Sequence, residues 1–185
     1  MKTSELSILI VPGLGGSGPD HWQSRWEAKL STARRVLQPD WDRPNRRLWT
    51  ETLVEAVNAA ERPVVLVAHS LGVATVAHAA PDFAAPVLGA FLVGLSDWNR
   101  AELIPGLAHD FAPLPRDPLP FPSLLVASRN DPFCEFETAA DFANAWGSAL
   151  IDAGEAGHLN ADSGHGPWPE GLLRFATFLK RLPAA

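Results

Sequence analysis

The sequence predicts an α/β fold, a three-layer α/β/α sandwich built on a mostly parallel sheet of about six strands. Two observations carry this prediction. Several apolar runs are continuous rather than alternating, which is typical of strands that are covered on both faces. These runs also alternate with segments of helical spacing, an order that favours a parallel sheet with right-handed crossovers.

The strands are expected where apolar residues run together, at residues 7–11, 35–38, 63–68, 87–93, 123–127 and 148–152. The helices are expected where apolar side chains recur at helical spacing, at residues 22–30, 49–60, 71–79, 135–146 and 169–182. Active sites of such sheets lie beyond the carboxyl ends of the strands. The residues that directly follow each strand are therefore the main candidates for function.

Length and composition limit the possible functions. The 185 residues are expected to form one domain, 1–185, with a sizeable core, since 46% of them are hydrophobic. A net charge of −6 argues against nucleic acid or an anionic membrane as a partner. The single cysteine, Cys134, cannot form an internal disulfide, and no apolar run is long enough for a signal peptide or a membrane span. We therefore expect a cytoplasmic protein.

A proline-rich segment departs from the regular alternation of strands and helices. Residues 97–122 hold six prolines and little periodicity, and they follow the strand expected at 87–93. Long loops inside compact domains are usually functional or disordered, and the apolar content here favours a packed, stiff loop over that edge of the sheet. Four apolar side chains are expected to wall a small pocket beside Ser70: Leu103, Ile104, Leu107 and Phe111.

Ser70 is the candidate nucleophile. It lies in Ala68-His-Ser-Leu-Gly72, directly between a buried strand and a helix. In a strand–turn–helix elbow the serine occupies a strained turn, and the positions two before and two after it must be small. The alternative is a serine that only caps the helix. The buried strand and the small residues around Ser70 favour the nucleophile.

A serine hydroxyl needs a base, and the candidates are histidines. His158 is expected to be the base, because it follows the last strand after a short loop in which Gly154 and Gly157 allow a bend. His165 is the alternative, and it could instead be a loop residue before the last helix. His21 and His109 lie in loops, and their roles stay open. His69 is expected to be structural, and His78 is expected to be a packing or surface residue.

The base needs an acid that orients its ring. Asp131 is the expected acid, because it directly follows the strand at 123–127. The sequence Asn-Asp-Pro around it is also strong turn chemistry, and both roles are compatible. Asp97, after the strand at 87–93, is the rival, and Asp152 lies only six positions before His158.

Two backbone amides are expected to form an oxyanion hole. One belongs to Leu71, the residue after the nucleophile. The other belongs to the glycine-rich loop Val11-Pro-Gly-Leu-Gly-Gly16, where Leu14 is the expected donor. A phosphate-binding loop is the competing interpretation, but the loop lacks both the G-K-[ST] ending and the G-x-G-x-x-G spacing.

Four motifs together resemble the serine hydrolase family of small α/β-hydrolases related to retinoblastoma-binding protein nine. They are VPGLGGSGPDHWQSRWE (11–27), VLVAHSLG (65–72), FPSLLVASRNDPFC (121–134) and GHLN (157–160). The resemblance runs nearly end to end. It implies a minimal α/β-hydrolase fold without a large cap, with Ser70 as nucleophile, Asp131 as acid and His158 as base, in the chain order of that superfamily.

The function expected from these residues is the hydrolysis of small carboxylic esters through an acyl-enzyme. The alternatives are an amidase or aminopeptidase, and a protein-interaction module in which the catalytic residues are vestigial or secondary. No cofactor is expected, and no metal site, because the sequence shows neither HExxH nor paired-cysteine spacing. The expected partner is a small-molecule ester or acyl substrate.

Overall fold

The computed structural model describes residues 3–100 and 110–183. Its six strands are all parallel and follow the order β2-β1-β3-β4-β5-β6 across one sheet. The strands are β1 (Ser7–Val11), β2 (Ala33–Arg35), β3 (Val64–His69), β4 (Val87–Val93), β5 (Ser123–Ala127) and β6 (Ala149–Asp152). The α-helices are α1 (Trp22–Lys29), α2 (Arg46–Asn58), α3 (Leu71–Ala79), α4 (Phe136–Trp146) and α5 (Pro169–Arg181).

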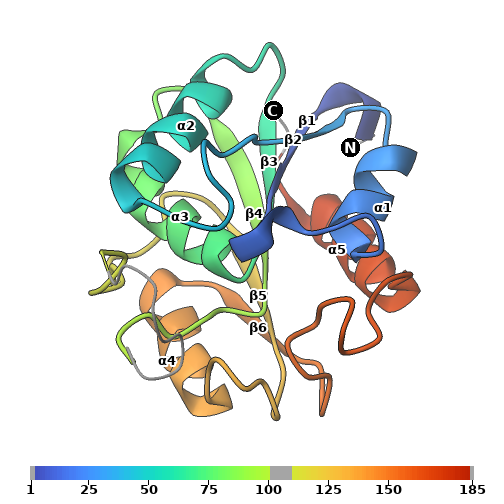
Figure 1. The fold of residues 1–185 in the computed structure, drawn as a ribbon. Coiled ribbons are helices and arrows are strands. Elements are labelled where there is room, and N and C mark those ends of the chain that lie inside the picture. Colours follow the sequence, from blue (N-terminus) through green and yellow to red (C-terminus); the bar gives the residue numbers. More distant parts are fainter. Residues whose placement is uncertain (1–2, 101–109, 184–185) are drawn as a thin grey trace.

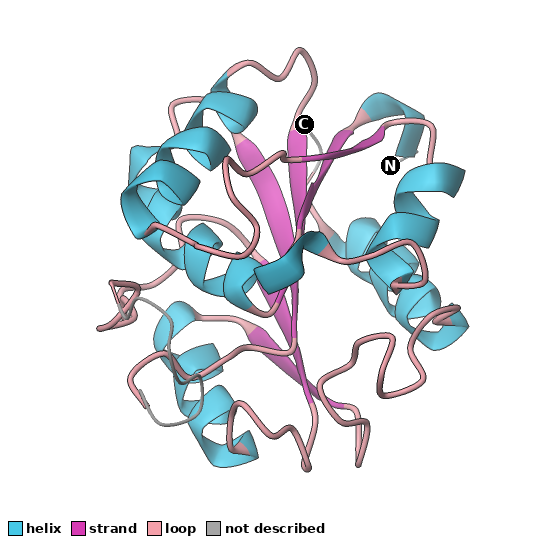
Figure 2. Ribbon diagram, in the orientation of Figure 1, coloured by secondary structure: helices cyan, strands magenta, loops and turns pink. Residues whose placement is uncertain are grey.

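Helices cover both faces of the sheet, which gives the predicted three layers (Figures 1 and 2). Helices α2, α3 and α4 lie on one face, and their core is built around Trp49, Leu53 and Phe142. Helices α1 and α5 lie on the other face, where Trp26 and Phe175 stack at 5.5 Å between ring centroids. Each central strand therefore sends alternate side chains into two different cores, which explains its continuous apolar sequence.

The predicted parallel sheet and three-layer fold are confirmed, and only β2 and α2 have boundaries that differ from the expected ones by more than one residue. Strand β2 pairs with β1 through residues 33–35, two residues earlier than expected, because the apolar run that suggested residues 35–38 turns outward. There Val36 is buried but Leu37 is 72% exposed. Helix α2 begins at Arg46 rather than Trp49, because the Asn45 side chain accepts a hydrogen bond from the backbone N–H of Leu48 and caps the helix.

Strand order reverses direction at β1, since β2 lies on one side of it and β3 on the other. The loops that follow β1 and β3 therefore leave in different directions and open a crevice, the usual ligand site of such sheets. Here the two loops touch. An added Cβ on Gly13 would lie 2.7 Å from Cβ of Ser70 and 3.2 Å from N of Leu71. The fold thus brings the glycine-rich loop after β1 next to the turn at Ser70.

The proline-rich segment is partly described. Phe111 is fully buried, and its ring contacts those of Trp49, Trp98 and His78, so this part of the segment packs into the core as expected. The prediction for Leu103, Ile104 and Leu107 concerns side chains outside the described residues, as does the open prediction for His109. Within the described ranges, no helix is both long and apolar enough to cross a bilayer.

His21 begins α1 from a buried position. Its Nδ1 accepts a hydrogen bond from the backbone N–H of Gln23 at 3.1 Å, and its ring lies 4.7 Å from that of His69. Burial lowers the pKa of His21 to about 4, and the positive charge of Arg35 and the neighbouring His158 and His165 act in the same direction. The folded protein therefore holds this ring neutral at pH values where an unfolded chain would protonate it.

Folding stability is expected to decrease as the pH is lowered, because of His21. Above pH 6.5 the ring is neutral in both states, and stability is complete; between pH 6.5 and 4 only the unfolded chain binds the proton. This costs about 3 kcal/mol by pH 4, at about 1.4 kcal/mol per pH unit. Urea unfolding at several pH values should show a steeper loss for the wild type than for His21→Asn, which keeps a capping acceptor. Parallel curves for the two proteins would contradict this assignment.

Candidate active site

Ser70 occupies a strained turn between β3 and α3. Its backbone has φ 56° and ψ −123°, a region that residues other than glycine rarely adopt. Its N–H donates to the carbonyl oxygen of Val93 at 3.0 Å, which ties the turn to the end of β4. The Ser70 side chain makes no capping hydrogen bond to α3. The hydroxyl is instead held above the carboxyl edge of the sheet, as a strand–turn–helix elbow requires.

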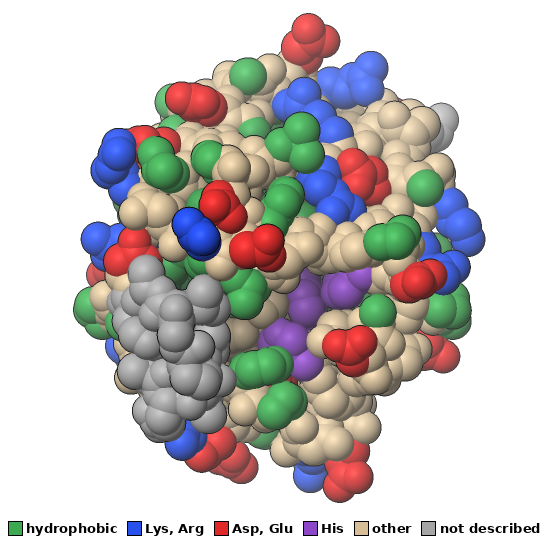
Figure 3. Space-filling model, viewed as in Figure 1, with side chains coloured by type: hydrophobic (Ala, Val, Ile, Leu, Met, Phe, Trp, Pro, Cys, Tyr) green, Lys and Arg blue, Asp and Glu red, His purple; other side chains and the backbone are tan. Residues whose placement is uncertain are grey.

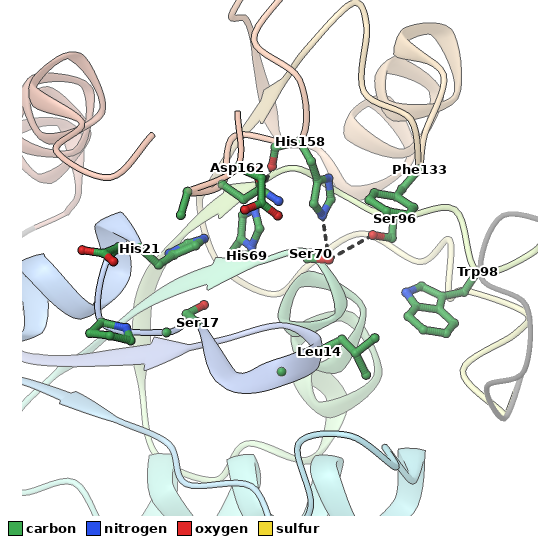
Figure 4. A pocket seen from close by; sticks show the side chains of 16 residues that line it. Leu14, Ser17, His21, His69, Ser70, Ser96, Trp98, Phe133, His158 and Asp162 are labelled. Atoms are coloured by element: carbon green, nitrogen blue, oxygen red, sulfur yellow. Dashed lines mark hydrogen bonds between the residues drawn. The ribbon is translucent and has the colours of Figure 1, made fainter. Parts of the chain in front are cut away.

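The structure brings His158 and Asp131 to this hydroxyl. Nε2 of His158 lies 2.9 Å from Oγ of Ser70 (Figure 4). Nδ1 of His158 lies 3.0 Å and 2.9 Å from the two carboxylate oxygens of Asp131, whose side chain is only 3% exposed. A carboxylate only accepts hydrogen bonds, so Nδ1 carries the proton and Nε2 presents a lone pair to Ser70. The loops after β3, β5 and β6 supply these three side chains.

The rival residues have other partners. One carboxylate oxygen of Asp97 accepts from the backbone N–H of Asn99 at 3.1 Å. Asp152 forms an exposed ion pair with Arg129, whose guanidinium is the main cause that lowers the pKa of Asp152. Nδ1 of His165 lies 3.2 Å from the hydroxyl of Ser163. None of these contacts reaches Ser70, so the geometry singles out His158 and Asp131.

His69 supports His158 from beneath. Nε2 of His69 lies 2.9 Å from the backbone carbonyl oxygen of His158, and because a carbonyl only accepts, this nitrogen carries the proton. Burial holds the pKa of His69 well below its ordinary value, and the nearby His158 and His21 lower it further. The expected structural role of His69 thus has a definite form, a hydrogen bond to the backbone of the candidate base.

Hydrogen bonds hold the loop after β1 in place beside Ser70. Arg35 donates to the carbonyl oxygens of Gly16 and Ser17, and the N–H of Gly15 donates to Trp41 at 3.0 Å. The 3-10 turn Leu14–Gly16 lies within this loop. In the described part of the chain, no hydrogen bond occupies the backbone N–H of Leu14 or of Leu71. Leu71 also stands at the start of α3, whose dipole favours negative charge there.

A cavity of about 450 Å³ opens over these groups. In Figure 3 it is a hollow in which histidine side chains show between apolar and acidic ones. Its large apolar lining residues are Leu14, Trp98 and Phe133, while Asp20 and Asp162 line its acidic part. The prediction that Phe111 walls this pocket is wrong. That ring lies behind the wall, 5.6 Å from the ring of Trp98, because the core takes up its apolar surface.

Ser96 is a site residue that the sequence analysis missed. Its Oγ lies 3.1 Å from Oγ of Ser70, and the residue is 1% exposed (Figure 4). The signal that could have found it was its position, three residues beyond the end of β4. At that position the sequence instead favours Asp97, the neighbouring carboxylate, since acids are the usual partners of a histidine base.

Metal binding finds no support in the side-chain arrangement. Across residues 3–100 and 110–183, no group of three or more histidine, cysteine, aspartate or glutamate side chains is placed to hold an ion. Cys134 is buried as a free thiol, and burial raises its pKa to about 12.

Comparisons with known proteins agree with the fold. A YdeN-like hydrolase of Pectobacterium atrosepticum is 33% identical, with a TM-score of 0.87 over 98% of this chain and 95% of that one. The ydeN gene product of B. subtilis is 20% identical, with a TM-score of 0.76 over 96% and 100% of the two chains. An esterase domain from Rhodothermus marinus is 18% identical, with a TM-score of 0.69 over 95% and 86%.

The search of curated proteins finds no match. The model of the family described as Serine hydrolase matches residues 8–177, a span that includes the described sheet except Ser7 and all the side chains gathered around Ser70. This match and the 33% identical structure show that the chain is an enzyme with an α/β-hydrolase fold, and that it belongs to the serine hydrolase family.

Proposed function

We propose that this protein hydrolyses small carboxylic esters through an acyl-enzyme, with Ser70 as nucleophile, His158 as general base and Asp131 as the acid that orients it. One observation carries the proposal. A continuous hydrogen-bond path runs from Oγ of Ser70 through both ring nitrogens of His158 to the buried carboxylate of Asp131. We further propose that residues 1–185 form one catalytic domain, since a single sheet supplies all three side chains.

The path supports a two-step reaction. His158 takes the proton of Ser70 as Oγ attacks the ester carbonyl carbon, and Asp131 stabilises the imidazolium that forms. The backbone amides of Leu14 and Leu71 stabilise the oxyanion, and the imidazolium then protonates the departing alcohol. In the second step His158 takes a proton from water, which attacks the acyl carbon, and Ser70 recovers its proton as the acid product leaves.

The shape of the pocket supports a small substrate. A cavity of about 450 Å³ is at the small end of ligand sites. Trp98 and Phe133 give it apolar surface near Ser70, enough for a short acyl chain. Ester chemistry is further supported by the structural neighbour from Rhodothermus marinus, which is described as an esterase domain. The resemblance of the four motifs to the group of retinoblastoma-binding protein nine agrees with hydrolase chemistry on a minimal fold.

A fluorophosphonate probe tests the proposal directly. The probe should form one covalent adduct, and mass spectrometry of the digested protein should place it on Ser70, because the elbow, the base and the oxyanion amides together activate this hydroxyl. Ser70→Ala should remain unlabelled. A folded wild-type protein that is not labelled, or is labelled elsewhere, would leave a protein-interaction module as the better interpretation.

Variants of the base and the acid should separate His158 from its sequence rival. His158→Ala and Asp131→Asn should each lower kcat/KM for p-nitrophenyl acetate by roughly 10⁴-fold while circular dichroism shows an intact fold. His165→Ala is the matched control and should keep nearly full activity, since the His165 ring contacts Ser163 and Trp168. The reverse order of the two histidine variants would overturn the assignment of the base.

Esters with long acyl chains should have a lower kcat/KM than esters with short ones. Each buried methylene adds about 0.8 kcal/mol of binding only while the pocket has room for it. We therefore expect acetyl to butyryl esters of p-nitrophenol to show higher kcat/KM than decanoyl or longer esters. The series is measured below micelle-forming concentrations, with the same leaving group throughout. A steady rise in kcat/KM out to the palmitoyl ester would indicate a lipase-like groove instead.

A further inference from the structure

A second hydroxyl touches the candidate nucleophile. Oγ of Ser96 lies 3.1 Å from Oγ of Ser70, a contact that Figure 4 shows separately from the one between Ser70 and His158. The backbone holds Ser96 in place, because its carbonyl oxygen accepts from Trp98 at 3.1 Å and the next residue, Asp97, donates to Phe133 at 2.9 Å. Ser96 is 1% exposed and lines the cavity, so its hydroxyl is fixed at the reacting atom.

The direction of this hydrogen bond follows from the rest of the path. Asp131 accepts from Nδ1 of His158, so Nε2 of the neutral ring is an acceptor. The proton of Ser70 must therefore point to His158. Oγ of Ser70 has only lone pairs left for Ser96, and Ser96 is the donor of the bond between the two hydroxyls.

We propose that Ser96 is a further catalytic residue, whose hydroxyl stabilises Oγ of Ser70 as the leaving group when the acyl-enzyme is hydrolysed. This inference rests on the proposed function. In that step a bond forms from the water oxygen to the acyl carbon, and the bond from the acyl carbon to Oγ breaks. The water proton passes to Nε2 of His158 and from there to Oγ. Negative charge develops on Oγ as its bond breaks, next to the Ser96 donor.

The effect should differ between the two halves of the reaction. In the resting enzyme Ser96 already donates to Oγ, so its bond stabilises both the starting state and the transition state of acylation. In the acyl-enzyme Oγ is an ester oxygen, which is a weaker acceptor than a hydroxyl or an alkoxide. The bond then strengthens only as Oγ departs, and only such differential stabilisation raises a rate.

Burst kinetics with p-nitrophenyl acetate test the inference. Stopped flow gives the acylation rate from the burst and the deacylation rate from the steady phase. Ser96→Ala should slow deacylation by about 10- to 100-fold, the range for a hydrogen bond to a developing charge. Its acylation rate should change by less than about 3-fold. Intact-mass spectrometry should then show acetyl-enzyme accumulating on Ser70.

One pair of variants at Ser96 and one variant at a distant serine control for packing. Ser96→Thr and Ser96→Val have nearly the same shape and differ in the hydroxyl, so Thr should deacylate faster than Val even where both bind less well. Ser123→Ala removes a similar, partly buried hydrogen bond, which joins Ser123 to Ser148. Ser123 begins β5 at the end of the strand opposite the site, so both rates should stay unchanged. Equal deacylation by the Thr and Val variants would overturn the role of Ser96, as would equal slowing of both steps in Ser96→Ala.

Failure of the inference and failure of the proposed function give different results. A wild-type protein that forms acetyl-Ser70, together with a Ser96→Ala variant that deacylates at the wild-type rate, refutes only the role of Ser96. A wild-type protein that never acylates Ser70 refutes both.

Discussion

The close approach of α3 to the end of β1 is the constraint on which the site depends. An added Cβ on Gly72 would lie 2.2 Å from the carbonyl oxygen of Val11, a backbone atom that cannot move aside. Without a side chain at Gly72, the first turn of α3 lies directly against β1, and the chain must bend sharply at Ser70 to enter the helix. The same approach sets the amide of Leu71 beside Gly13. One backbone contact thus places the candidate nucleophile and both candidate oxyanion donors.

A buried, neutral side chain, that of Gln23, connects the ends of β1 and β3 near this contact. The amide of Gln23 donates to the carbonyl oxygens of Val11 and Val67, which belong to β1 and β3, and its oxygen accepts from Ser17 in the loop after β1. Both strand ends and the loop are therefore tied to α1 by one side chain that carries no charge. A neutral amide does this at a lower desolvation cost than a buried ion would incur.

Local patterns in the sequence predicted those parts of the molecule that depend on local chemistry. The small residues around Ser70 and the buried strand before it indicated the turn, and the positions of Asp131 and His158 after strands suggested that they would meet. Ser96 also follows a strand, but a serine there carries no local sign of a role in the site, and its importance comes only from the contact with Ser70. Phe111 was misplaced for a related reason: apolar character predicts burial, but it does not tell a pocket wall from the core behind it.

The histidines around the site show how burial selects which ring can become charged. Asp131 neutralises the imidazolium that the proposed reaction forms on His158, and the edge-on ring of Phe133, 4.7 Å away, shields that pair from solvent. His69 lies at 4.8 Å on another side and donates to the backbone of His158. A protonated His69 would repel the imidazolium, so its lowered pKa is a condition for a base that must itself accept a proton. Of the three rings of His21, His69 and His158, only that of His158 is hydrogen-bonded to a carboxylate, and the charge of the proposed reaction therefore develops beside the candidate nucleophile.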